Sequence, residues 1–359
     1  FISGETIPMK IKVGIIGAGA IANDHCKNLL AHPDAEVVAV ADLSRERREQ
    51  VKKEHGLTRA YESWEKLVAD PDLDAIAIAL PNVLHAPAAL AAIAAGKHVL
   101  LEKPFAMNYA EAKKVADAAA KKKRVLMIGM NQRYSKDAQT LRELVRRGEL
   151  GEVYHTKTYW YRRQGSPKFG TWFVNKKLSG GGCLLDIGVH YLDLALHLID
   201  NWAPVSVSGQ IYGKFGHRGL GEGGWGKSDR VKSLKFDVDD FATGLIKFKN
   251  GATMELNVSW ILHQETPNRN NVELYGTDAG ASLNPLKLFR AGRRTGEYEA
   301  TSPQNVTLKT VYTNRQANWI DAILGKAKPL CEVRQSLVVQ KILDSIYKSS
   351  ATGREVRLS

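Results

Sequence analysis

The sequence predicts two successive domains: an α/β Rossmann domain with a doubly wound parallel sheet, then an α+β domain with a large, mostly antiparallel open sheet. Three observations predict this. The chain has 359 residues, about two domains of ordinary size. Between Lys10 and Met130, short apolar runs alternate with alanine-rich helical stretches. After Arg133 this alternation gives way to longer strand-like segments. We expect domains at 9–131 and 132–359, with the last helix packing back on the first domain.

The first part reads as strand, helix, strand, repeated. We expect strands at 11–16, 36–41, 74–80, 98–101 and 125–130, and helices at 20–30, 45–55, 86–95 and 109–122. The strands are continuous runs of β-branched residues and alanine, as in a sheet that is buried on both faces. Such a sheet is parallel and is joined by right-handed crossovers.

The residue pattern of the second part predicts an antiparallel sheet with a few helices. We expect helices at 137–147 and 183–199, and strands at 152–161, 205–212, 241–248, 253–260 and 272–275. Lys249-Asn250-Gly251 lies between two of these strands and predicts a hairpin. The stretch 213–233 is rich in Gly and Lys and predicts a long loop.

A glycine-rich turn follows the first strand. Gly17-Ala18-Gly19-Ala20-Ile21-Ala22 fits G-x-G-x-x-A, and it opens the first helix. Gly17 permits the tight turn, Gly19 lets a pyrophosphate approach the backbone, and Ala22 permits close packing of helix on strand. The pyrophosphate would meet amide groups at the helix N-terminus, where Ala20 and Ile21 lie. The turn therefore predicts a dinucleotide site.

Asp42 ends the second strand, 25 positions after Gly17. A carboxylate there accepts hydrogen bonds from the adenosine ribose hydroxyls and repels a 2′-phosphate, which favours NAD. Arg45, with Arg47 and Arg48 close behind, could accommodate that phosphate, so NADP stays open.

Two further segments carry groups that could do acid–base chemistry. Glu102-Lys103-Pro104 stands at the end of the fourth strand, where a doubly wound sheet faces its ligand crevice. Asp186 and His190 are four apart on a predicted helix, so the carboxylate could orient the imidazole and keep its pKa near neutrality. The alternatives are a surface turn for the first segment and a structural ion pair for the second.

Composition narrows the class of protein. The net charge of +13 is scattered, and no nucleic-acid motif accompanies it. Three distant cysteines give neither a disulfide framework nor metal spacing, which favours a reducing, cytoplasmic location. Asp193 and His197 continue the stripe of Asp186 and His190, but four ligands on one helix cannot close around an ion, so we expect no metal. No apolar run approaches the roughly 18 residues of a membrane helix, so we expect no membrane partner.

Taken together, five segments in order resemble the Gfo/Idh/MocA family, which includes glucose-fructose oxidoreductase and inositol dehydrogenase. The segments are Gly17–Ala22, Leu80–His85, Glu102–Pro104, Asn131–Tyr134, and Gly182–His190 with Asp193. The resemblance spans essentially the whole chain. It implies a homodimer or homotetramer built on the second sheet.

The resemblance also implies roles for individual residues. It makes Lys103, Asp186 and His190 the catalytic trio. It places Pro81, Asn82 and His85 on the nicotinamide side, with Glu102 beside Lys103 and Arg133 near the cofactor. The implied reaction moves hydride from a secondary alcohol of a sugar, glycoside or cyclitol to the nicotinamide. His190 takes the hydroxyl proton, Lys103 donates a hydrogen bond to the oxygen, and Asp186 tunes that pair.

Residues that could line a sugar site are chosen by composition only. They are Trp160, Tyr161, Arg162, Arg163 and Trp172, which precede the predicted catalytic helix, and His263, which follows a later strand. The alternative is that the tryptophans belong to the core and the arginines to the surface. Two other functions stay open, namely an NAD-dependent glycosidase that oxidises its substrate transiently and a non-catalytic regulator that binds dinucleotide.

Overall fold

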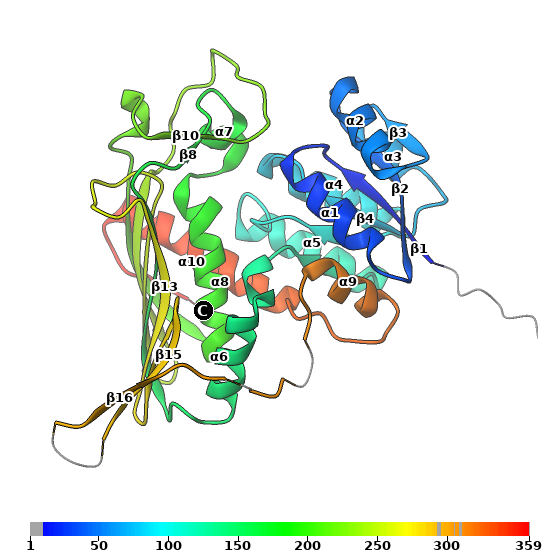
Figure 1. Cartoon of the computed structure of the whole chain (residues 1–359). Helices are drawn as coiled ribbons and strands as arrows, with labels where there is room; N and C mark the ends of the chain where they lie inside the picture. Colours follow the sequence, from blue (N-terminus) through cyan, green and yellow to red (C-terminus); the bar gives the residue numbers. More distant parts are fainter. Residues whose placement is uncertain (1–9, 293–295, 305, 309–310, 359) are drawn as a thin grey trace, which may run out of the picture.

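Figure 1 shows a computed structural model of the chain, which describes residues 10–292, 296–304, 306–308 and 311–358. The first part forms a six-stranded parallel sheet in the order β3-β2-β1-β4-β5-β6. The strands are β1 (Ile11–Ile16), β2 (Ala35–Ala41), β3 (Arg59–Tyr61), β4 (Ala75–Ile78), β5 (His98–Leu101) and β6 (Leu126–Ile128). The strand order reverses between β1 and β4, which is where a doubly wound sheet opens its ligand crevice. The predicted Rossmann fold is confirmed.

Local sequence signals set the helices of this part. They are α1 (Ala20–Leu30), α2 (Arg45–His55), α3 (Trp64–Val68), α4 (His85–Ala94) and α5 (Tyr109–Lys122), with a 3-10 turn at Asn82–Leu84. At the start of α5 the Asn108 side-chain oxygen accepts a hydrogen bond from the Glu111 amide, and the Glu111 carboxylate accepts one in return from the Asn108 Nδ2. Such a reciprocal cap fixes a helix start. The sequence missed β3 and α3, which have three and five residues and are too short to show a period.

The second part forms a nine-stranded sheet in the order β16-β15-β14-β13-β7-β12-β11-β9-β17. Its strands are β7 (Val153–Arg162), β9 (Pro204–Tyr212), β11 (Phe241–Phe248), β12 (Thr253–Ser259), β13 (Asn268–Gly276), β14 (Gly280–Leu283), β15 (Leu286–Ala291), β16 (Tyr298–Thr301) and β17 (Val356–Arg357). All neighbours pair antiparallel except β7 and β12, which are parallel. The predicted hairpin at Lys249-Asn250-Gly251 joins β11 to β12, with Gly251 at a φ of +89°.

The predicted long loop carries a short strand of its own. β10 (Glu222–Trp225) pairs with β8 (Ser166–Pro167), and a 3-10 turn at Gly216–Arg218 precedes it. The Asp240 carboxylate accepts hydrogen bonds from the amides of Lys214, Phe215 and Gly216, so it fixes the start of the loop.

Helices cover one face of the large sheet, and Figure 1 shows them between it and the first part. They are α6 (Lys136–Arg146), a π-helical turn (Leu184–Gly188), α8 (Val189–Ile199) and α10 (Val333–Thr352). Two further helices lie elsewhere: α7 (Lys176–Ser179) contacts the 3-10 turns at Asn82–Leu84 and Trp172–Val174, and α9 (Arg315–Ile323) lies beside the parallel sheet. A 3-10 turn at Asn131–Tyr134 leads into α6. α9 packs against α1, whereas α10 contacts both β9 and α5.

The sequence led us to expect no segment apolar enough to cross a membrane, but the helical stretch Lys176–Ile199 is long and apolar enough to do so. It contains no uninterrupted apolar run of that length. Within the protein, 83% of its most apolar window is buried. The apolar character of this stretch is therefore used for packing, since α8 lies between the large sheet and α6.

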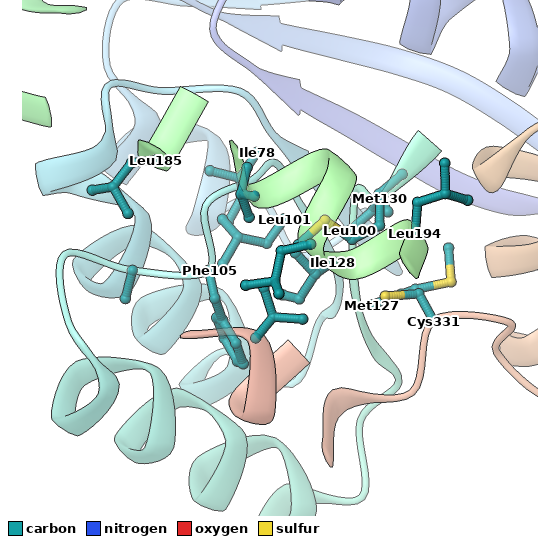
Figure 2. Packing of buried hydrophobic residues seen from close by; sticks show 14 of the residues in the cluster. Ile78, Leu100, Leu101, Phe105, Met127, Ile128, Met130, Leu185, Leu194 and Cys331 are labelled. Atoms are coloured by element: carbon teal, nitrogen blue, oxygen red, sulfur yellow. The ribbon is translucent and has the colours of Figure 1, made fainter. Parts of the chain in front are cut away.

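One hydrophobic cluster runs through both parts of the molecule. Figure 2 shows Leu194 of the central helical stretch beside Met130, and Cys331 of the C-terminal region beside Met127, in the same cluster as Leu100 and Ile128 of the parallel sheet. The carboxyl end of β5 is thereby held against the start of the stretch that carries Asp186 and His190.

Candidate active site

The glycine turn after β1 forms a cradle that only small residues permit. Gly17 has a φ of +96°, and a Cβ there would lie 2.3 Å from the Ala79 carbonyl oxygen. A Cβ on Gly19 would meet nothing within 4 Å, so open space lies beside the N-terminus of α1. Among the described residues no side chain caps this helix, so its first amides are available to a phosphate. The turn with Ala20 and Ile21 fits a pyrophosphate.

Asp42 stands at the end of β2 and faces this turn. Its carboxylate accepts hydrogen bonds from the amides of Ala18 and Ser44, each at 2.8 Å. The Arg47 guanidinium lies 3.3 Å from Asp42 and 3.2 Å from Asp229, whereas Arg45 is exposed. Because the Asp42 carboxylate faces this turn and also pairs with Arg47, the end of β2 favours a ribose hydroxyl over a phosphate.

Lys103 follows β5 and reaches the helical stretch of the second part. Its Nζ donates to the Asp186 Oδ1 and to the Asp186 backbone oxygen, both at 2.8 Å. The Lys103 side chain is 17% exposed, so the surface-turn interpretation is wrong. The Trp260 Nε1 donates to the other Asp186 oxygen, Oδ2, at 2.9 Å. Burial raises the pKa of Asp186, but the charge and hydrogen bond of Lys103, together with the charges of Arg162 and His190, hold that pKa below its ordinary value.

His190 lies in the first turn of α8, and its surroundings correct the sequence expectation. The sequence predicted Asp186 beside the imidazole, with a pKa near neutrality. Instead the Asp186 oxygens are taken by Lys103 and Trp260. The π-helical turn over Leu184–Gly188 has more residues per turn than an α-helix, so positions four apart no longer align. Burial, followed by the Lys103 charge, lowers the His190 pKa from 6.5 to about 3.

The imidazole is therefore neutral over the ordinary pH range. Its Nδ1 is buried and has no hydrogen-bond partner among the described residues. A neutral imidazole keeps one nitrogen lone pair, so the half-buried ring can accept a proton or a hydrogen bond from a bound molecule.

Two of the residues expected on the nicotinamide side connect parts of the protein instead. The Asn82 Nδ2 donates to the Ser179 carbonyl oxygen at 2.7 Å, and Asn82 follows the half-buried Pro81. The His85 Nδ1 lies 2.7 Å from the Pro104 oxygen, and its Nε2 lies 2.9 Å from the Leu80 oxygen. Burial lowers the pKa of His85. Both side chains are buried, and they fix the loops that surround Lys103.

Glu102 and Arg133 were also expected to contact the cofactor, and the structure turns their side chains inward. Glu102 lies 2.7 Å from Arg315 and 3.2 Å from His25, at 8% exposure. Arg133 is fully buried and pairs with Asp193 through its Nε, at 2.7 Å. We therefore leave both side chains out of the cofactor site. Because Asp193 pairs with Arg133, its carboxylate does not face Asp186 or His190 as a continuous row of helix residues would require.

The expected sugar-lining residues separate into a group near Asp186 and a group with other contacts. Arg162 belongs to the group near Asp186, because its charge contributes to lowering the Asp186 pKa. The Arg162 guanidinium lies 4.6 Å from the Trp160 ring centre and 5.8 Å from that of Trp225, and it donates to the Gly165 oxygen. Trp225 was missed by the sequence because it lies in the predicted loop.

The side chains of the second group have other contacts. Tyr161 stacks on Tyr159 and Phe241, which places it away from Arg162, since neighbours along a strand face opposite sides of the sheet. The remaining three contact other parts of the second domain: Arg163 donates to the Glu265 oxygen, Trp172 stacks on Phe173, and His263 lies edge-on to Phe215. None of these contacts involves Asp186, although Phe173 links Trp172 to Trp225 of the Arg162 group, with ring centres 5.2 Å apart.

Comparisons with known proteins agree on one family. Residues 11–130 match the sequence model of an oxidoreductase family with an NAD-binding Rossmann fold, and residues 138–282 match the GFO/IDH/MocA C-terminal domain. The chain is similar to the D-glucoside 3-dehydrogenase of Escherichia coli strain K12, with 31% identity over 350 residues that cover 97% of each protein. It is also 31% identical over 350 residues to the 1,5-anhydro-D-fructose reductase of Ensifer adhaerens, covering 96% of this chain and 98% of that protein. The crystal structure of an NAD-binding protein from Listeria innocua matches with a TM-score of 0.79 and 26% identity, over 97% of each chain.

Proposed function

The chain belongs to the GFO/IDH/MocA family of NAD-binding oxidoreductases, and from that premise we propose that it oxidises a secondary alcohol of a glucoside or a related sugar with NAD. One observation carries the proposal. Lys103, Asp186 and His190 come together where the carboxyl end of the parallel sheet meets the central helical stretch, at the edge where such a sheet binds its cofactor.

The relatives support a sugar with a glycosidic or anhydro linkage over a free cyclitol. Both named relatives cover nearly the whole chain, and their names specify a D-glucoside and 1,5-anhydro-D-fructose. The Arg162 guanidinium, whose charge acts on Asp186, supplies N–H donors that suit sugar hydroxyls.

The cofactor would be held by the glycine turn and Asp42. The cradle at Gly17 and Gly19 would receive the pyrophosphate, and the Asp42 carboxylate would accept the ribose hydroxyls. Bound NAD would supply the hydride acceptor, and the protein would supply orientation and charge.

Lys103 and His190 would act on the substrate hydroxyl in two different ways, as hydrogen-bond donor and as proton acceptor. A lysine ammonium has three N–H donors, and two of them point to Asp186, so one is left for the substrate oxygen. That donor stabilises the oxygen as negative charge develops on it. The neutral His190 imidazole accepts the hydroxyl proton. Asp186 stays ionised and holds the Lys103 ammonium in place.

The proposal is tested with a panel of methyl glucosides, anhydro sugars, free aldoses and cyclitols, each incubated with NAD and followed by NADH absorbance. We expect NADH to form fastest with a glucoside. Release of the methyl aglycone without net NADH would identify the glycosidase alternative. Failure of every substrate to reduce NAD would contradict the proposal.

A further inference from the structure

Asp186 is a buried carboxylate whose two oxygens have different partners. Oδ1 accepts a hydrogen bond from the Lys103 ammonium at 2.8 Å, and Oδ2 accepts one from the Trp260 indole N–H at 2.9 Å. The Asp186 side chain is only 11% exposed, so water satisfies little of it. A buried carboxylate oxygen without a donor carries a large desolvation cost. Each of the two donors therefore stabilises the ionised form of Asp186.

Trp260 is suited to serve as the second donor. Its indole is fully buried, and its backbone amide donates to the Asp240 oxygen at 2.9 Å, directly after β12. The Phe236 ring packs edge-on against it, with ring centres 6.4 Å apart. The indole position is thus fixed from more than one side. An indole N–H donates and never accepts, and it carries no charge.

The absence of charge on this donor matters for the site. Lys103 and Arg162 already place positive charge near Asp186, and His190 lies in the same group. A second cation on Oδ2 would compete with Lys103 for the carboxylate. A neutral donor leaves Lys103 as the direct ionic partner and fixes the rotation of the carboxylate, so that Oδ1 faces the Lys103 ammonium.

We infer that Trp260 is a positioning residue, which keeps Asp186 ionised and oriented and thereby places the Lys103 ammonium toward the substrate oxygen. The inference deepens the proposed function and rests on it for the substrate step. The hydrogen bond and its effect on Asp186 stand independently of which sugar is oxidised.

The chain offers a matched control for this residue. Trp319 in α9 is also fully buried, but its Nε1 has no hydrogen-bond partner among the described residues. Trp260→Phe and Trp319→Phe therefore remove similar volumes of buried ring, and only the first removes a donor from Asp186. Replacing Trp260 with β-(3-benzothienyl)alanine removes the N–H while keeping the ring shape, which guards against a fold that does not tolerate phenylalanine.

The first measurement follows Asp186 itself, through carboxyl ¹³C NMR of protein labelled at aspartate, with the signal assigned by Asp186→Asn. Loss of the indole donor should raise the pKa of Asp186, so its titration should move to higher pH by about one unit, the scale of one hydrogen bond to a charged group. Trp319→Phe should leave the Asp186 titration where it is in the parent. An unmoved titration in both Trp260 variants would overturn the inference.

The second measurement follows turnover with NAD and the best glucoside. The Trp260 variants should lower kcat with little change in the KM for NAD, and the acid limb of kcat should move to higher pH together with the Asp186 titration. If the titration moves but kcat and its pH profile match those of Trp319→Phe, Trp260 is structural and the positioning role is wrong. If the parent oxidises no sugar, the proposed function fails, while the titration alone still decides whether Trp260 holds Asp186 ionised.

Discussion

The Lys103 ammonium and the Asp186 carboxylate form a 2.8 Å ion pair that joins the end of the parallel sheet to the central helical stretch of the second part. The pair is mostly buried, and the Asp186 backbone oxygen also accepts from Lys103. The Asp186 oxygens are thus bonded to Lys103 and Trp260 rather than to His190, and the Asp186 charge only partly opposes the fall in the His190 pKa. The proton acceptor and the charged donor are thus separate groups in the site, and each can be tested alone.

Lys103→Met should lower kcat by about 10²-fold or more, the scale of general acid–base catalysis. The reason is that no other group donates to the substrate oxygen in the proposed reaction. NAD binding, measured by calorimetry, should stay near the parent value because the glycine turn and Asp42 are intact. Unchanged turnover would remove Lys103 from the reaction, and a folded protein that no longer binds NAD would assign Lys103 to the cofactor instead.

His190 should act as a base without showing a histidine-like pH profile. Its pKa in the folded protein is about 3, so the ring is already deprotonated far below its ordinary value of 6.5. Because the base must be unprotonated to act, kcat should stay flat on the acid side between about pH 5 and pH 8, the range in which an unperturbed histidine would titrate. His190→Asn should lower the rate over that whole range. A parent profile with a midpoint near the ordinary value, lost in His190→Asn, would show that the imidazole is solvated during turnover.

Asp42→Ala should narrow or reverse the preference for NAD over NADP. The carboxylate repels a 2′-phosphate, and its removal frees Arg47 to receive one. We expect the ratio of kcat/KM for the two cofactors to change by about tenfold or more, which corresponds to roughly 1.4 kcal/mol.

Asp229→Asn is the matched control, because Asp229 pairs with the same guanidinium but its side chain is 83% exposed. It should change the cofactor ratio little. If the parent already prefers NADP, the interpretation of Asp42 is wrong and the arginines of α2 decide the choice.

Arg133→Met should destabilise the protein without entering the chemistry. It leaves Asp193 buried and unpaired, and breaking such a pair costs about 3–5 kcal/mol. Burial already raises the pKa of Asp193, and Arg133 opposes that shift. Urea unfolding measures the loss, with Lys113→Met as the control, since the Lys113–Asp117 pair is exposed. A variant of parental stability with impaired NAD binding would instead restore Arg133 to the cofactor site.

Much of the fold could be predicted because its signals are local. The glycine turn before α1, the Ser44 cap and the Gly56 stop of α2, and the Asn108 cap of the alanine-rich α5 all lie within a few residues of their helices, so these helices begin and end where the sequence predicts. The resemblance named the residues that meet at the end of β5. Short elements such as β3 were missed because three residues show no period.

The partners within the site could not be predicted, since they depend on how distant segments pack. Trp260 lies 74 positions after Asp186 in the chain, and nothing in its neighbourhood marks it as a donor. The assignment of Asp186 to His190 assumed a regular α-helix, and the π-helical turn broke that assumption. Tyr161 and Arg162 are adjacent in sequence, but the pleat of β7 sends them to opposite faces.

The most direct test follows the hydrogen that leaves the sugar. Methyl β-D-glucopyranoside carrying deuterium on its ring carbons is incubated with NAD and the parent protein, and the recovered nicotinamide cofactor is examined by mass spectrometry. Isotope transfer is visible even when net NADH formation is small. We predict that the reduced cofactor carries one deuterium with the parent and that transfer falls sharply with Lys103→Met. A reduced cofactor without deuterium, or equal transfer by both proteins, would contradict an oxidation carried out at the Lys103, Asp186 and His190 site.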